Sequence, residues 1–202
     1  IIDNAYGMPF PNIIYSDVTL NWHENIILCF SLSKVGLPGV RTGIIVAAPE
    51  VVKAVSSLNA IVNLSPTRFG AAIATPLLQD GRLKQLSDDV IRPFYRNQAQ
   101  TAVSLLKREL GAYPLKIHKP EGAIFLWLWF ENLPVSSQTL YEMLKAEDTL
   151  IIPGEHFFVG IDTQDYPHAR ECIRMSIAQD AQTLEKGIAA IGRVVRGLYD
   201  AA

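Results

Sequence analysis

The residues best suited to chemistry lie in one segment, Ser31-Leu-Ser-Lys-Val-Gly-Leu-Pro-Gly-Val-Arg-Thr-Gly43. Its lysine, Lys34, follows an apolar run of strand length, and a deprotonated lysine amine can attack a carbonyl carbon. The two serine hydroxyls and the guanidinium of Arg41 are donors that suit a phosphate group. Two glycines allow the backbone to approach a ligand closely. The segment is therefore suited to bind a phosphorylated aldehyde through its lysine.

A second pair of candidates, Asp3 and Tyr6, stands upstream of this segment. A carboxylate beside a pyridine nitrogen keeps that nitrogen protonated, and the protonated ring is an electron sink for a carbanion. A tyrosine hydroxyl can donate to a phenolic oxygen on the same ring. Taken singly, such an aspartate is more often a turn residue and such a lysine a solvated surface charge. Their occurrence together, in this order, favours a cofactor site.

The first half of the chain predicts an α/β arrangement. Ile26–Phe30 and Thr42–Ala48 are unbroken apolar runs, which are typical of strands in a parallel sheet buried on both faces. Ile1-Ile2 reads as a further strand of that sheet, and Glu50–Leu58 has helical spacing. We expect residues 1–93 to form part of a large domain with a mostly parallel sheet and helices.

A long helical pattern follows from about Ser87 to Leu110 and contains Pro93. Proline within a helix predicts a boundary or a kink nearby. This position is therefore a candidate hinge between the large domain and a small domain of residues 94–202.

The second half predicts a small α+β domain with segregated layers. In the strand Ala123–Phe130, alternation places Ile124, Leu126, Leu128 and Phe130 on one face and Phe125, Trp127 and Trp129 on the other. The other elements are the strands Thr149–Ile152 and Cys172–Ala178, the helix Ser137–Ala146 with Ser136 or Ser137 as its N-cap, and a final helix capped by Asp180.

These motifs together resemble a known family. Asp3-x-x-Tyr6 followed by Ser31–Arg41 is similar to the fold-type-I, class I/II aminotransferases, and the resemblance extends over the whole chain. Within the family it is closest to the valine–pyruvate (alanine–valine) transaminases. The sequences Asp-Asn-Ala-Tyr-Gly-Met-Pro-Phe-Pro at Asp3–Pro11 and Ser-Pro-Thr-Arg-Phe-Gly at Ser65–Gly70 carry that closer likeness.

The resemblance implies pyridoxal 5'-phosphate as the cofactor and gives each candidate a role. Lys34 forms the covalent imine with the cofactor and carries protons during the reaction. Asp3 pairs with the pyridinium nitrogen, and Tyr6 contacts the phenolic oxygen. Ser31 and Arg41 bind the phosphate.

The resemblance also implies an arginine that binds the substrate carboxylate. Arg174, in Cys-Ile-Arg-Met-Ser-Ile-Ala, matches the motif in the family's late strand, whereas Arg170 precedes the strand. The activity implied is transfer of an amino group between an amino acid, alanine or valine, and a 2-oxo acid such as pyruvate. The full-length protein is then expected to be a homodimer.

Two alternatives stay open at this point. One is another fold-type-I enzyme such as a lyase, although a carboxylate-binding Arg174 disfavours a decarboxylase. The other is an aminotransferase-like sensor domain of a transcription regulator, which a preceding helix-turn-helix domain would reveal. The chain lacks an initiator methionine and the family's phosphate loop, so we expect a fragment that is inactive alone.

Composition narrows the remaining possibilities. A net charge of −2 gives no basic excess for a nucleic-acid partner, and no apolar run is long enough to span a membrane. No His, Cys, Asp and Glu cluster has the spacing of metal ligands. Cys29 and Cys172 lie in apolar runs and are expected to be buried free thiols of a cytoplasmic protein.

Overall fold

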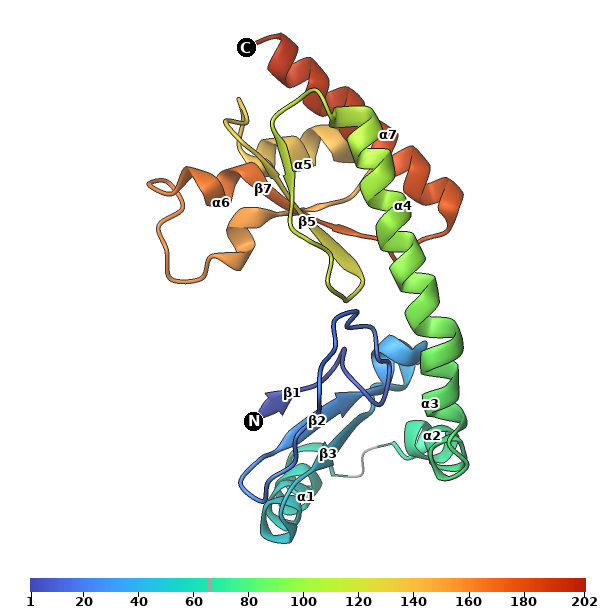
Figure 1. The fold of residues 1–202 in the computed structure, drawn as a ribbon. Coiled ribbons are helices and arrows are strands. Elements are labelled where there is room, and N and C mark those ends of the chain that lie inside the picture. Colours follow the sequence, from blue (N-terminus) through green and yellow to red (C-terminus); the bar gives the residue numbers. More distant parts are fainter. Residues whose placement is uncertain (65–66) are drawn as a thin grey trace. The chain divides into compact units, whose positions relative to one another are not determined.

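The structure, a computed structural model, describes residues 1–64 and 67–202. The chain forms two compact units (Figure 1). Unit 1 comprises Ile1–Arg96 with Glu121–Ala123, and unit 2 comprises Asn97–Pro120 with Ile124–Ala202. Two residues of the motif Ser65–Gly70, at positions 65 and 66, lie outside the described residues.

Unit 1 contains a three-stranded mixed sheet in the order β1-β2-β3. β1 (Ile2–Asp3) pairs in parallel with β2 (Leu28–Ser31), so that Asp3 lies beside Cys29. β3 (Gly43–Val46) pairs with β2 in the antiparallel sense and places Gly43 beside Ser31.

The expectation of parallel strands therefore holds for the pairing of β1 with β2 and is wrong for the pairing of β2 with β3, the strands expected at Ile26–Phe30 and Thr42–Ala48. Parallel neighbours need a long crossover connection, but the link between β2 and β3 consists of the 3-10 turns η1 (Leu32–Val35) and η2 (Pro38–Val40). The burial of β3 is also lower than expected, because three of its four residues are exposed.

The core of unit 1 is a small apolar cluster between the sheet and the helices that follow it. Its buried members include Phe30 of β2 and Leu32 and Val35 of η1, with Ala74 and Leu83 from helices. The helices are α1 (Pro49–Asn63), α2 (Phe69–Gln79) and α3 (Arg82–Leu86). α1 contributes no buried residue, although its apolar spacing predicted a helix correctly.

The long helical pattern changes type next to Pro93. A π-helical turn, η3 (Ser87–Ile91), follows α3, and α4 (Arg92–Leu110) begins one residue before the proline. Because α3, η3 and α4 follow one another without a break, Pro93 lies inside a continuous helical segment, and the π-helical turn is the irregularity expected beside a residue that lacks a backbone N–H.

Unit 2 contains an antiparallel sheet in the order β4-β5-β7-β6. Its strands are β4 (Leu115–Ile117), β5 (Phe125–Phe130), β6 (Ile152–Pro153) and β7 (Cys172–Ser176). The alternation expected for β5 is confirmed, because Leu126, Leu128 and Phe130 are buried and the intervening aromatic residues are partly exposed. The strand expected at Thr149–Ile152 is shorter than predicted and starts only at Ile152.

Two helix caps in unit 2 match the sequence signals. Ser136 accepts a hydrogen bond from the backbone N–H of Thr139 and starts α5 (Ser137–Lys145). Asp180 accepts from the N–H of Thr183 and starts α7 (Ala181–Asp200), whose buried side chains include Leu184, Ile188 and Val195. The turn η4 (Gly154–Phe157) and α6 (Pro167–Glu171) complete the unit.

Both cysteines are free thiols. Cys172 is buried as expected, whereas Cys29 is only half-buried. Burial raises the pKa of the Cys172 thiol to about 11. Within the described ranges, no helix combines the length and the apolar character needed to cross a bilayer.

Candidate active site

The candidate cofactor residues of unit 1 follow the carboxyl ends of two neighbouring parallel strands. Asp3 ends β1 and Ser31 ends β2, and the N–H of Asn4 donates to the carbonyl of Cys29 at 2.8 Å. Open α/β sheets bind ligands outside the carboxyl ends of their strands. The loops that carry Tyr6 and Lys34 therefore leave the sheet at the same end of its strands.

Lys34 lies on the 3-10 turn η1, and two buried neighbours fix that turn. Leu32 and Val35 point into the core of unit 1, so that Lys34 between them stays only partly buried. Ser31 caps the turn by accepting the N–H of Ser33 at 3.2 Å, and its own hydroxyl proton remains available to donate. The structure brings Lys34 and Tyr6 together, because Nζ lies 5.8 Å from the centre of the tyrosine ring.

Glycine at position 36 ends this turn for a steric reason. Gly36 adopts a left-handed conformation with φ of 97° and donates its backbone N–H to the carbonyl of Leu32. A side chain is strained in that conformation. A Cβ added there would meet nothing within 4 Å, so the backbone beside Lys34 borders open space.

The loop that carries Tyr6 is closed on itself by hydrogen bonds. The N–H of Ile13 donates to the carbonyl of Tyr6 at 2.9 Å, and that of Asn12 donates to the carbonyl of Gly7 at 3.0 Å. The side chain of Asn4 crosses the loop and donates to the carbonyl of Met8 at 2.7 Å. The position of Tyr6 therefore depends on the loop backbone as well as on the end of β1.

A polar network ties the same loop to the helices of unit 1. Asn12 donates to the Asp88 carboxylate at 2.6 Å and accepts from the Arg92 guanidinium at 2.9 Å. Lys84 forms an ion pair with Asp88, and the hydrogen bonds from Lys84 and Asn12 lower the pKa of Asp88. Asn12 belongs to none of the motifs that marked candidate residues, and its backbone has the unusual φ of 55°.

Arg41 stands at the other end of the connection between β2 and β3. It is exposed and has a left-handed backbone with φ of 47°, which is uncommon for a residue other than glycine. One guanidinium N–H donates to the carbonyl of Pro38 at 3.4 Å. The next residue, Thr42, accepts the N–H of Leu32 at 3.2 Å, so Arg41 is anchored to the turn of Lys34.

The start of α2 packs tightly against this connection. A Cβ added to Gly70 would lie 2.1 Å from Oγ1 of Thr42, a distance that real atoms do not reach. A glycine is therefore required where α2 approaches the Arg41 loop. The motif Ser65–Gly70 contains this glycine, but the sequence did not predict the close packing that requires it.

Arg174 belongs to unit 2, in the middle of β7. Its strand partners are Trp127 of β5 and Ile152 of β6. The guanidinium carbon lies 4.1 Å from the ring centre of Phe125 and 4.7 Å from that of Phe157. Its Nε is buried and has no hydrogen-bond partner. Among residues 1–64 and 67–202, no carboxylate forms an ion pair with this guanidinium.

An aromatic cluster continues from Arg174 across the same face of the sheet. Trp127 meets Phe157 edge-on with ring centres 5.3 Å apart, and Trp129 meets His168 at 4.7 Å. The indole of Trp129 donates to the Glu171 carboxylate at 2.7 Å. Alternation in β5 predicted that its aromatic residues share a face, but the sequence did not indicate that Phe125 packs on Arg174 or that Trp127 is its strand partner.

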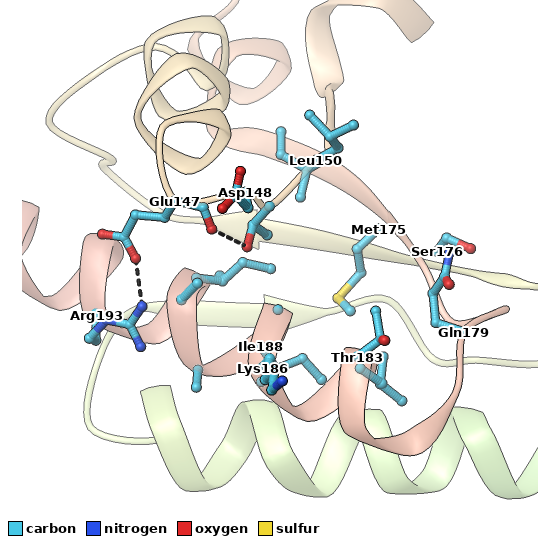
Figure 2. Close-up of a pocket in the computed structure, with 17 residues that line it drawn as sticks. Glu147, Asp148, Leu150, Met175, Ser176, Gln179, Thr183, Lys186, Ile188 and Arg193 are labelled. Carbon is cyan, nitrogen blue, oxygen red and sulfur yellow. Dashed lines mark hydrogen bonds and ion pairs between the residues drawn. The ribbon is translucent and has the colours of Figure 1, made fainter.

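One groove of unit 2 is separate from these groups. It has a volume of about 690 Å³ and lies between residues 147–151, the end of β7 and the start of α7 (Figure 2). Its one arginine, Arg193, is already paired with Glu147 at 2.6 Å. None of the residues selected from the sequence lines it. Elsewhere in the described chain, no group of three His, Cys, Asp or Glu residues could hold a metal ion.

Comparison with known proteins agrees with the resemblance seen in the motifs. Residues 1–191 match the family described as aminotransferase class I and II. The chain is 44% identical to the valine–pyruvate aminotransferase of Escherichia coli K12 over 188 residues, which are 93% of the chain and 45% of that protein.

Solved structures give the same relationship. A putative amino-acid aminotransferase from Psychrobacter arcticum 273-4 superposes with a TM-score of 0.95 at 70% identity, covering 99% of the chain and 46% of the other. The valine–pyruvate aminotransferase of Salmonella typhimurium LT2 gives a TM-score of 0.91 at 42% identity, covering 99% of the chain and 51% of the other.

The chain thus spans about half the length of the relatives that it matches. The family that matches consists of pyridoxal-phosphate-dependent aminotransferases. Because its model covers nearly the whole chain, the protein belongs to the class I and II aminotransferases.

Proposed function

We propose that this chain contributes the lysine-bearing part of an aminotransferase that exchanges an amino group between alanine or valine and a 2-oxo acid such as pyruvate. The observation that carries the proposal is the placement of Lys34. It lies on a short turn after β2, beside the Tyr6 ring and next to open space at Gly36. The similarity to valine–pyruvate aminotransferases over 93% of the chain supports the choice of substrates.

The side chains present in unit 1 fit pyridoxal 5'-phosphate chemically. Lys34 supplies an amine for its aldehyde carbon, and Ser31 and Arg41 supply donors for its phosphate. Tyr6 supplies a hydroxyl for its phenolic oxygen and Asp3 a carboxylate for its ring nitrogen. The approach of the Lys34 Nζ to within 5.8 Å of the Tyr6 ring centre agrees with one ligand that both residues contact. When bound, this cofactor supplies an electron-poor ring that accepts electron density from the amino acid.

The protein's own residues then have distinct tasks. Lys34 holds the cofactor until an amino acid replaces it, and its freed Nζ moves the proton that leaves the substrate α-carbon. Asp3 would keep a positive charge on the ring nitrogen, because a neighbouring carboxylate favours the protonated form. Arg174 binds the α-carboxylate, for which a guanidinium is geometrically matched.

The experiment that tests the proposal identifies the modified lysine. The full-length protein is incubated with pyridoxal 5'-phosphate, reduced with borohydride and digested, and the pyridoxyl-labelled peptide is sequenced. We expect a single label on Lys34. A label on another lysine would show that the cofactor site has been assigned wrongly.

Substrate choice needs a separate measurement. Turnover with L-alanine or L-valine and 2-oxo acids should exceed turnover with aspartate or aromatic amino acids. A protein that is labelled on Lys34 but prefers an unrelated amino acid would keep the catalytic assignment and contradict the proposed substrates.

A further inference from the structure

Arg174 is a half-buried residue with one unusual polar atom. Buried polar atoms are normally hydrogen-bonded. Here Nε is buried without a partner, and the rings of Phe125 and Phe157 pack against the guanidinium, with centres 4.1 and 4.7 Å from its carbon. The positive charge is therefore held by aromatic faces and is not neutralised by any described carboxylate.

The two rings differ in how they are supported. Phe125 is part of β5 and is fixed by backbone pairing with Ser176 of β7. Phe157 ends the short turn η4, is 42% exposed, and is held by its edge-on contact with Trp127. Trp127 is in turn the direct strand partner of Arg174. Phe157 is thus the more exposed of the two rings that pack on the arginine.

We propose that Phe157 is a positioning residue that fixes the Arg174 guanidinium for a carboxylate ligand. This inference rests on the proposed function, in which Arg174 binds the α-carboxylate of the substrate. A ring that packs on the guanidinium restricts its rotation and leaves its edge N–H groups to pair with a carboxylate. The missing neutralising charge is then supplied by the ligand.

The neighbouring residue provides a matched control. Phe158 contacts Trp127, Tyr166 and His168, with ring centres 6.2, 5.5 and 5.9 Å away, and has no contact with Arg174 of the kind that Phe157 makes. Phe158→Leu removes a ring of the same size from the same aromatic cluster. A difference between the two variants therefore reports on the arginine contact and not on the cluster as a whole.

The test uses the full-length protein and two readouts. The first is the dissociation constant of isovalerate, a branched carboxylate without an amino group, measured by calorimetry without turnover. The second is the separation of KM from kcat with L-alanine. We expect Phe157→Leu to weaken isovalerate binding and to raise KM about tenfold, with a much smaller change in kcat. Phe157→Tyr keeps the ring, so its isovalerate dissociation constant and its KM should stay close to those of the unmodified protein.

Further variants keep the outcome decisive. Phe157→Met retains side-chain volume without a ring and replaces Phe157→Leu if the leucine variant does not fold. In an Arg174→Ala background, Phe157→Leu should change isovalerate binding no further. Equal effects of Phe157→Leu and Phe158→Leu, or no saturable binding of isovalerate to the unmodified protein, would overturn the inference. If the protein shows no transamination but the variants change isovalerate binding as expected, the proposed function would be overturned and the role of Phe157 in binding a carboxylate would stand.

Discussion

The two units of the chain differ in what their helices bury. α1 of unit 1 has no buried residue, and Leu58, Ile61 and Val62 along it are more than half exposed. α7 of unit 2 buries seven residues on one face. Both helices have apolar spacing that can be seen in the sequence, yet among the described residues only α7 packs its apolar side chains into a core. Apolar spacing predicts a helix, but it does not tell whether the surface that covers the helix is present.

Most of the candidate site residues lie in unit 1, the unit that buries less. Unit 1, with the smaller core, carries five of the candidate residues at strand ends and on the turns and loops that follow, whereas unit 2 carries Arg174 in the middle of a well-packed sheet. Side chains on loops can be replaced without opening a core. The comparison therefore predicts that substitutions in unit 1 affect activity more than folding, and that substitutions in the core of unit 2 do the reverse.

The largest effect is expected for Lys34→Ala in the full-length protein. Because no other assigned group can both hold the cofactor and move the substrate proton, turnover should fall by about a thousandfold or more. The lysine is only partly buried, so the melting temperature should change little apart from any loss of bound cofactor. Substantial remaining turnover would contradict the assignment of the catalytic lysine to Lys34 of unit 1.

A pair of substitutions tests the difference in packing directly. Phe130→Ala empties a fully buried position in β5 and should lower the free energy of unfolding by about 3–5 kcal/mol. Leu58→Ala in α1 should change it by no more than about 0.5 kcal/mol in the 202-residue chain, since Leu58 is 61% exposed. Urea titrations of both variants give the measurement. A large cost of Leu58→Ala in the full-length protein alone would show that α1 is covered there.

Arg174→Ala is expected to act on substrate use and not on cofactor binding. Truncating one partner of a closed guanidinium–carboxylate pair costs roughly 2–5 kcal/mol, so catalytic efficiency with amino acids should fall at least about thirtyfold. Cofactor absorbance should be retained. A loss below about threefold in catalytic efficiency would give Arg174 another role and make Arg170 the next residue to examine.

The smallest effect concerns the polar network of unit 1. The pKa of Asp88 is lowered in the folded protein, so its contribution to stability is present above the unfolded pKa of about 3.9 and is lost as pH falls through the folded value. Asp88→Asn should therefore destabilise the protein by up to about 1 kcal/mol at pH 7 and much less near pH 3. Asp89→Asn, at the next and exposed position, is the control. Equal effects at both positions and at both pH values would contradict the network.

Local signals in the sequence were sufficient for several elements. Ser136 and Asp180 marked the starts of α5 and α7, and alternation in β5 identified its buried face. Each of these features depends on residues close together in the chain. α2 was not predicted from the sequence, and it contains Pro76, a residue that disfavours the interior of a helix.

Features that depend on distant residues were not accessible in the same way. The direction of β3 is set by the two short turns between Ser31 and Gly43, and not by its apolar composition. Asn12 meets Asp88 across 76 positions of sequence. The contacts of Arg174 with Phe125 and Phe157 require the register of three strands. The residue types at the candidate site were therefore predictable, whereas the groups that position them were not.

The distribution of tryptophans gives the two units different optical properties. Trp22 in unit 1 is 51% exposed, so its fluorescence should resemble that of an indole in water. Trp127 lies against Phe157, and the indole of Trp129 is bonded to Glu171, so the unit 2 emission should be shifted to shorter wavelength. With Trp22→Phe, the remaining signal would come from the two indoles on the face of Arg174. Intrinsic fluorescence would then report carboxylate binding there without an attached dye.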